Sequence, residues 1–305
     1  MSQRERIRSF LIVILFYVLV VESSRQTRQN TQDTHQVCSA PYSRVRLSKA
    51  YQKRVIAFTL FASSDSSAVS ASLVAGSLQN IADSRLYYPG WFVRFYVFDV
   101  GRLLERQLLD AGDFVEIVQC RHSSILTTSK SRKMISRFLV LDDPTVHIAI
   151  IRDADSRFSP RELFAVNQWL SSDLMFHSMR DHEYHDVPVM GGMFGCVASQ
   201  WRRAPQSISK LLKEALSDGQ QEIVARNVPG EDQAFLAKYV WPIVRHSTFS
   251  HDVLQERCVR YGSKRCETFP MGGDAKGFYV GAAYRDDLGS LTGHISCNFT
   301  CGTNR

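Results

Sequence analysis

The chain has 305 residues, of which 44% are hydrophobic, 22% charged and 11% aromatic, and its formal net charge is +7. This composition excludes a fibrous or broadly disordered protein, and the length suits one large α/β domain. The positive charges are dispersed rather than gathered into a basic stripe with interleaved aromatic residues, so the sequence predicts no nucleic-acid partner.

Residues 1–24 are predicted to be a signal peptide or a signal anchor. An apolar run at positions 10–21 follows the basic residues Arg4, Arg6 and Arg8. At about 1.5 Å per residue the run is short for a hydrocarbon core of about 30 Å, which favours a cleaved peptide. No A-x-A-like site follows it, which favours a type II membrane anchor. Both outcomes place the rest of the chain in the secretory pathway, either in the Golgi lumen or secreted.

Residues 25–49 are rich in polar side chains and are predicted to be a stem or linker, with the folded domain spanning 50–305. Seven cysteines in a luminal protein indicate disulfides and at least one free thiol. Candidate pairs are Cys258 with Cys266 and Cys297 with Cys301, although spacing does not decide connectivity. Asn298 begins an N-glycosylation sequon, which fits a luminal glycoprotein.

The first part of the domain alternates short apolar runs with helical patterns. Strands are expected at 55–61, 91–98 and 114–118, and helices at 67–83 and 101–111. The apolar runs lack polar alternation, which is typical of strands covered on both faces. The predicted fold class is therefore α/β, with a mixed, mainly parallel, Rossmann-like sheet and helices on both faces.

Two aspartates come directly after the next strand. A helix at 128–141 ends at Asp142-Asp143-Pro144, and the strand at 147–151 leads into Arg152-Asp153-Ala154-Asp155-Ser156-Arg157. Ser159 then caps a further helix. Ligands of open α/β sheets bind beyond the carboxyl ends of strands, and carboxylates are hard oxygen ligands for Mn²⁺ or Mg²⁺. A D-x-D also occurs in solvated turns, so the interpretation as a metal site depends on its position directly after a strand.

Several motifs in this order resemble one lineage of the GT-A glycosyltransferases. They are R-x-x-x-L-D-D-P at 137–144, R-D-A-D-S-R at 152–157, W-L-x-S at 169–172, R-D-H-x-Y-H at 180–185, G-G-M-[FW]-G at 191–195 and D-Q-x-F-L at 232–236. The resemblance implies a nucleotide-binding half at 50–157 and an acceptor half at 158–305. It also implies a metal held by the D-x-D, and transfer from a UDP- or GDP-sugar to a hydroxyl on a glycan, protein or lipid.

The resemblance also assigns roles to residues around the D-x-D. Asp153 and Asp155 would bind the metal and the donor phosphates, with Arg137, Arg152 and Arg157 as further donor-binding candidates. For Arg152 and Arg157 the alternative is a structural salt bridge. The nucleoside would lie near Thr59 and the loop at 62–65.

The R-D-H-x-Y-H segment and the diglycine are candidates for the sugar and acceptor. The residues are Arg180, Asp181, His182, His185, Gly191 and Gly192. A zinc site using the two histidines is an alternative, as is a loop whose histidines only bridge neighbouring groups. The diglycine permits close approach of a ligand, and a strand bulge would require the same residues.

Two carboxylates and three histidines complete the candidate site. Glu231 and Asp232 stand at a predicted helix N-terminus, where they would serve as catalytic base or merely as caps, and Asp232 is the preferred base. His246, His251 and His294 compete as third metal ligand, with His251 the choice.

Two other classes of function compete with a transferase. A non-catalytic luminal protein could use the aspartates to bind carbohydrate or a cation. A metal-dependent phosphoester hydrolase would need further His and Asp clusters for a two-metal site, which the sequence lacks. The donor, the acceptor, and retention or inversion of configuration depend on the shape of the pocket.

Overall fold

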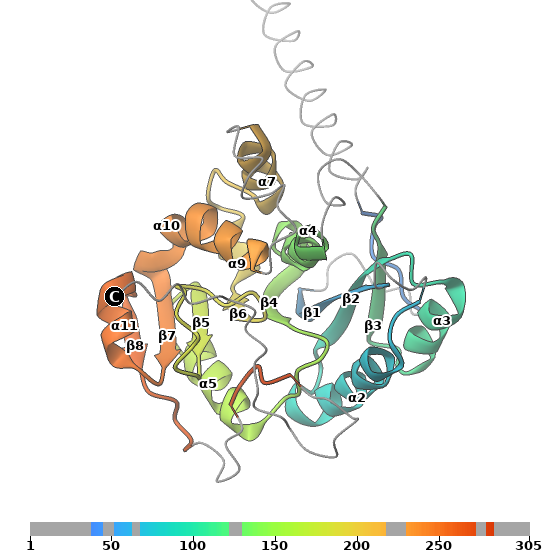
Figure 1. Cartoon of the computed structure of the whole chain (residues 1–305), viewed down its shortest axis with the longest axis horizontal. Coiled ribbons are helices and arrows are strands. Elements are labelled where there is room, and N and C mark those ends of the chain that lie inside the picture. The colour runs from blue at the N-terminus through green and yellow to red at the C-terminus, as the bar shows by residue number, and fades with distance from the viewer. Residues whose placement is uncertain are drawn as a thin grey trace, which may run out of the picture.

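In the computed structural model, which describes residues 38–44, 52–62, 68–121, 130–217, 230–272 and 279–283, eight strands form one sheet. Their order is β3-β2-β1-β4-β6-β5-β7-β8 (Figure 1). The bounds are β1 Lys53–Phe61, β2 Phe92–Phe98, β3 Val115–Gln119, β4 Val146–Arg152, β5 Phe176–Arg180, β6 Met193–Cys196, β7 Thr248–Asp252 and β8 Arg265–Glu267. β6 is antiparallel to β4 and β5, and the other neighbours are parallel. The predicted mixed, mainly parallel sheet is confirmed.

The central strands are buried on both faces because alternate side chains enter two different cores. In β1, Val55 and Ala57 pack into one core, while Ile56 and Phe58 pack into the other. This two-sided burial explains why the strands are continuously apolar.

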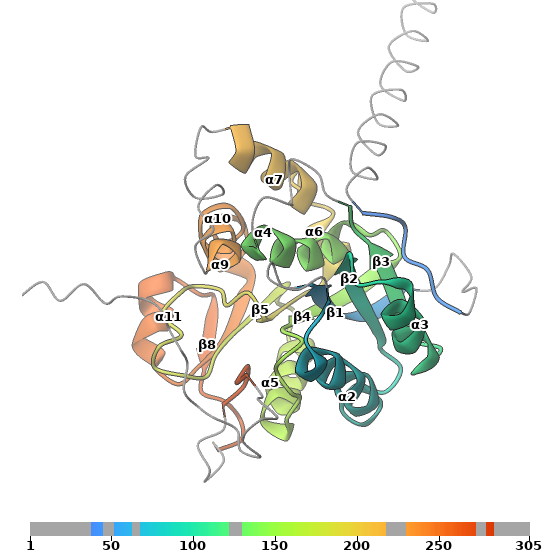
Figure 2. The same ribbon diagram turned by 45° about the vertical axis from the view of Figure 1, so that its right-hand side comes forward.

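The helices divide between the two faces of the sheet (Figure 2). One face is covered by α2 Ala71–Tyr87, α3 Arg102–Asp110 and α5 Pro160–Leu170. The other is covered by α4 Lys130–Ile135, the 3₁₀ helix η1 Ser136–Asp142, α6 Ala198–Trp201, α7 Ile208–Ser217, α9 Glu231–Phe235, the π-helical η2 Leu236–Val240 and α10 Trp241–Val244. The short η3 Arg245–Ser247 leads into β7, and α11 Gln255–Tyr261 follows it.

Local sequence signals explain where α5 begins. The Ser159 hydroxyl accepts a hydrogen bond from the Glu162 N–H at 3.2 Å and Pro160 occupies the first helical position, as predicted for α5. The predicted helix at 128–141 is instead a short α-helix followed by the 3₁₀ helix η1. That 3₁₀ turn carries Arg137.

The folded domain begins earlier than residue 50. Within the predicted stem, Cys38 and Tyr42 form antiparallel bridges with Cys120 and Ile117 of the β3 edge, and Cys38 is disulfide-bonded to Cys120. The sequence concealed this because the pairing partners lie about 80 residues away, with a separation of 82 for the cysteines. Residues 1–37, with the predicted signal segment, lie outside the described residues. Among those that are described, no helix is long and apolar enough to cross a membrane.

Two disulfides are present in the described part of the chain. The predicted pair Cys258–Cys266 is confirmed, and the Cys38–Cys120 pair was not foreseen. Cys196 is a buried free thiol, which agrees with an odd cysteine count. Cys297, Cys301 and the sequon at Asn298 lie outside the described residues. Disulfides are typical of an oxidising compartment.

Candidate active site

The two aspartates of the D-x-D follow β4 at the point where the strand order reverses. From β1 the chain runs outward to β2 and β3 on one side, while β4 lies on the other side of β1. In open α/β sheets this switch point, at the carboxyl ends of the strands, forms the crevice in which ligands bind. Asp153 and Asp155 therefore stand where the topology alone predicts a binding site.

Arg137 connects the D-x-D to a carboxylate far along the chain. Its side chain is fully buried, and Nη1 donates to Asp153 Oδ1 at 2.5 Å and to the Arg152 carbonyl at 2.8 Å. Nη2 lies 3.4 Å from Asp232 Oδ2. One guanidinium thus joins η1, the end of β4 and the start of α9.

Gly191 and Gly192 press against the same two carboxylates. A Cβ at Gly192 would overlap the Asp153 carboxylate, and one at Gly191 would overlap Oδ2 of Asp232. Neither glycine has a positive φ, so these positions require space rather than an unusual backbone conformation. Because the diglycine has no side chains, both carboxylates can pack closely against the backbone just before β6.

Glu231 and Asp232 begin α9 after Gly230, whose φ of 93° favours glycine. Both are buried. Asp232 stands in the first turn of α9, where the helix dipole favours a carboxylate, and its Oδ2 lies 3.4 Å from Arg137 Nη2. The two interpretations of Asp232 are therefore compatible.

The acidic groups at this site repel one another. Burial raises the pKa of Asp232, as does the charge of Asp153, while Arg137 opposes the rise. Partial loss of hydration raises the pKa of Asp155, and the charge of Asp153 raises it further. The Asp155 residue is nevertheless exposed to solvent. The Asp153 side chain is 31% exposed. A divalent cation at these oxygens would relieve the repulsion, so the residues fit a metal.

In the described part of the chain, no three His, Cys, Asp or Glu side chains are arranged to hold one metal ion. Two aspartates alone leave most positions of a hard cation for substrate oxygens and water, as Mg²⁺ sites on phosphate substrates commonly do.

His251 does not join the aspartates, and its prediction as third ligand is wrong. It lies buried on β7, where Nδ1 is 2.8 Å from His177 Nε2 and Nε2 is 3.0 Å from Gln168 Oε1. With β6 and β5 in between, β7 is separated from β4 by three interstrand spacings, about 14 Å. His246 is exposed on η3, and His294 lies outside the described residues.

The two arginines of R-D-A-D-S-R, Arg152 and Arg157, contact groups around the D-x-D loop. Arg152 is buried, donates to Glu162 at 2.6 Å and to the Phe194 carbonyl at 3.1 Å, and matches the salt-bridge alternative. Arg157 donates to the Ser156 carbonyl at 2.8 Å and lies against Gly76 of α2. Arg152 is engaged by these groups of α5 and β6, whereas Arg157 is close enough to Asp155 for its charge to oppose the rise in the pKa of that carboxyl.

Sequence reasoning missed Asn80, and it did not foresee the backbone conformation of Asp99. Asn80 of α2 is buried and donates through Nδ2 to the Ala154 carbonyl between the two aspartates, at 3.2 Å. Asp99 follows β2 with a φ of 51°, which is uncommon outside glycine. A single sequence gives no signal that an aspartate after a strand will adopt a left-handed backbone conformation. The predicted Thr59 is buried 3.4 Å from Ser136 Oγ, and most of the predicted nucleoside loop lies outside the described residues.

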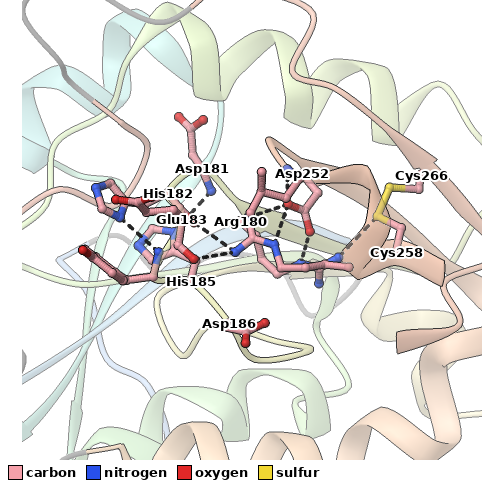
Figure 3. Close-up of polar contacts among 12 residues, drawn as sticks. Arg180, Asp181, His182, Glu183, His185, Asp186, Asp252, Cys258 and Cys266 are labelled. Atoms are coloured by element: carbon pink, nitrogen blue, oxygen red, sulfur yellow. Dashed lines mark hydrogen bonds and ion pairs between the residues drawn. A yellow bond between two sulfur atoms is a disulfide. The ribbon is translucent and has the colours of Figure 1, made fainter. Parts of the chain in front are cut away.

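The R-D-H-x-Y-H residues fall into two sets (Figure 3). Arg180 is buried, donating to Asp252 at 2.5 Å and to the Pro188 carbonyl at 2.6 Å. The Asp181 carboxylate accepts two bonds from Arg161, at 2.6 and 2.7 Å, and one from the Val280 N–H at 2.8 Å. These two residues shape the loop. His182 and the neighbouring Tyr184 are more accessible.

The zinc interpretation of the histidines finds no support. Nδ1 of His182 accepts a bond from the Tyr184 N–H and Nδ1 of His185 accepts one from the Asp181 N–H, each at 3.2 Å. No group of three suitable ligands occurs around them in the described residues. Burial lowers the pKa of His185 to about 3, which keeps its ring neutral near pH 7.

No protein-family model and no curated protein matches the sequence. Similar solved structures include the mannosyltransferase PcManGT from Pyrobaculum calidifontis in complex with GDP-Man and Mn²⁺, at 14% identity and a TM-score of 0.36. That match covers 53% of this chain and 49% of the other, so the chain spans about half of that protein's length. The galactosyltransferase LgtC matches at 12% identity and a TM-score of 0.42, over 79% of this chain and 98% of its own. The similarity to nucleotide-sugar glycosyltransferases is thus distant.

The buried histidines predict a loss of stability in acid. Burial lowers the pKa of His251 to about 4 from 6.5, and that of His177 well below 6.5. Both are neutral in the folded protein, whereas the unfolded chain takes up protons below about pH 6.5. Stability is therefore complete above that pH and is lost as the pH falls toward 4. We expect His251 alone to account for about 3 kcal/mol.

Urea denaturation across this pH range measures the effect. Replacing His251 with Phe should reduce the loss of stability in acid, with His177 still contributing, whereas replacing the exposed His246 should leave the loss unchanged. Equal pH dependence in all three proteins would contradict the assignment.

Proposed function

We propose that the chain is a metal-dependent glycosyltransferase that uses a nucleotide-sugar donor. The observation that carries the proposal is the convergence of Asp153 and Asp232 on the buried Arg137, beside a diglycine that leaves them room, at the switch point of the sheet. The order of the sequence motifs supports the same class of enzyme. The acceptor is a hydroxyl group.

Asp153 and Asp155 would hold Mn²⁺ or Mg²⁺ together with the donor diphosphate. When bound, such a cation offsets the negative charge on the departing nucleoside diphosphate. Arg137 donates to the Arg152 carbonyl and to Oδ1 of Asp153, so it would keep the D-x-D loop in place when a cation binds. Arg152 would act indirectly, by joining the end of β4 to β6 and to Glu162 of α5, while Arg157 would support the loop through the Ser156 carbonyl beside Asp155.

Asp232 is the residue we assign as catalytic base. In a single displacement that inverts the sugar carbon, its carboxylate would accept the proton of the attacking hydroxyl while the bond from that carbon to the nucleoside diphosphate breaks on the opposite face. Its partner Arg137 orients it, and its raised pKa makes it a better proton acceptor than an ordinary carboxylate. Glu231 precedes it on the same helix turn and is the comparison residue.

The activity belongs in the lumen of the secretory pathway, in the Golgi or in a secreted form. The apolar run at 10–21, the two disulfides and the sequon at Asn298 support this location. A chain anchored through its first 24 residues would face the lumen with its whole folded domain.

The double substitution Asp153→Ala and Asp155→Ala should abolish metal-dependent binding and hydrolysis of the donor, because it removes both oxygen ligands. Calorimetry with UDP- and GDP-sugars, with and without Mn²⁺, measures this. Asp113→Ala, an exposed carboxylate beside β3, is the matched control and should leave both unchanged. Failure of the folded wild-type chain to bind any donor would favour the non-catalytic luminal alternative.

Gly192→Ala should weaken Mn²⁺ binding about tenfold or more, since the added Cβ must displace the Asp153 carboxylate. Gly272→Ala, where a Cβ meets nothing within 4 Å, is the control. Electron paramagnetic resonance of Mn²⁺ reads out the affinity directly. Equal affinities in both variants would show that Asp153 does not hold the ion.

Asp232→Asn should slow sugar transfer to water by on the order of a hundredfold or more while leaving donor affinity nearly unchanged. In the wild type the rate should rise with pH over a range above the ordinary carboxyl pKa of 3.8, and the variant should lose this rise. Release of nucleoside diphosphate measures the rate. A larger effect from Glu231→Gln would transfer the role to that residue.

A further inference from the structure

Four rings gather on the acceptor side of the candidate site. His182 lies with its ring centroid 5.2 Å from that of Tyr184, 5.7 Å from His185 and 4.6 Å from Tyr279. The His185 and Tyr279 centroids are 5.4 Å apart. We call these four residues the ring cluster. Its outer member, Tyr184, is 68% exposed, and the adjacent Glu183 is exposed as well.

The backbone that carries the ring cluster is held by buried charges (Figure 3). Arg257 donates to the carbonyls of His182 and Glu183 at 3.0 and 3.1 Å and pairs with Asp252 at 2.6 Å. Arg180 pairs with the other oxygen of Asp252. All three charged side chains are at most 1% exposed.

Such a network stabilises little beyond what apolar residues of the same size would contribute, because desolvation offsets the attraction. What it does provide is a fixed geometry for an exposed loop. A rigid loop that presents an aromatic ring and a carboxylate to solvent is the construction expected of a recognition surface.

The ring cluster is tied to the D-x-D loop by residues 279–283. The Val280 N–H donates to Asp181, and Ala283 forms an antiparallel bridge with Ser156, the neighbour of Asp155. Four residue steps span at most about 14 Å, so Tyr279, the ring-cluster member on this segment, lies within about that distance of the residue that bridges to the D-x-D loop.

From this geometry we propose that the ring cluster binds the outer sugar units of a glycan acceptor, with Tyr184 stacking against a sugar ring. The proposal rests on the proposed function, since it extends the acceptor side of that site. A pyranose has an apolar C–H face and polar edges, so it suits an exposed aromatic ring flanked by the Glu183 carboxylate and the His182 imidazole.

The position of the ring cluster argues against binding of the donor nucleoside. The switch-point crevice lies between β1 and β4, whereas the ring cluster follows β5, which β6 separates from β4. Binding energy from outer sugars would hold the acceptor hydroxyl in place for reaction at the inner end. The acceptor class is therefore an oligosaccharide rather than a single sugar.

The test uses the full chain, the Tyr184→Ala variant and an array of immobilised oligosaccharides of increasing length with their component monosaccharides. We expect the wild type to bind longer oligosaccharides better, and Tyr184→Ala to bind them about three- to tenfold more weakly. Tyr184→Phe should retain binding. Phe164→Ala, which removes an exposed aromatic ring from α5, should behave as wild type.

Donor hydrolysis with Mn²⁺, measured on the same preparations, separates this inference from the proposed function. Unchanged hydrolysis in Tyr184→Ala with weaker oligosaccharide binding supports the ring cluster as an acceptor subsite. The inference is overturned if the wild type binds no oligosaccharide, if binding ignores Tyr184, or if only peptides bind in a Tyr184-dependent way. Absence of donor hydrolysis by the wild type would instead overturn the proposed function.

Discussion

The candidate site depends on the buried guanidinium of Arg137. A fully desolvated positive charge is costly unless several acceptors surround it, and here the Asp153 carboxylate and the Arg152 carbonyl lie within 2.8 Å while Asp232 lies at 3.4 Å. These acceptors come from the end of β4 and the start of α9, and each carboxylate lies against one glycine of the diglycine. The need to satisfy one charge therefore determines how the two halves of the candidate site meet.

Buried arginines paired with carboxylates also occur elsewhere in the protein. Arg152 pairs with Glu162 behind the D-x-D loop, and Arg180 and Arg257 share Asp252 behind the R-D-H-x-Y-H loop. Each of these buried arginines also donates to backbone carbonyls: Arg152 to the Phe194 carbonyl of β6, and Arg180 and Arg257 to carbonyls of the loop after β5, which they hold in place. Arg152 and Arg180 of the motifs are thus engaged by buried carboxylates of the protein itself.

Small residues complete this arrangement by leaving space. Gly191 and Gly192 admit two carboxylates to the edge of β6, and Gly76 admits Arg157 against α2. A glycine in a motif therefore indicates that another group packs closely against the backbone, but only the tertiary structure shows which group it is. At Gly192 that group is Asp153, which links the G-G-M-F-G motif to the D-x-D motif through a physical contact rather than through order along the chain.

Local chemistry allowed the sequence by itself to determine much of this protein. Continuous apolar runs predicted strands buried on both faces, Ser159 and Pro160 predicted the start of α5, and the strand before Asp153 placed the D-x-D at a carboxyl end. These features depend on neighbouring residues, so their signals lie within a few positions. Tertiary structure alone decided that Cys38 pairs with Cys120, that Arg137 meets Asp232 and that His251 faces His177 instead of the aspartates. Those contacts join residues 74 to 95 positions apart, and which strands and helices become neighbours depends on packing of the whole sheet rather than on any local pattern.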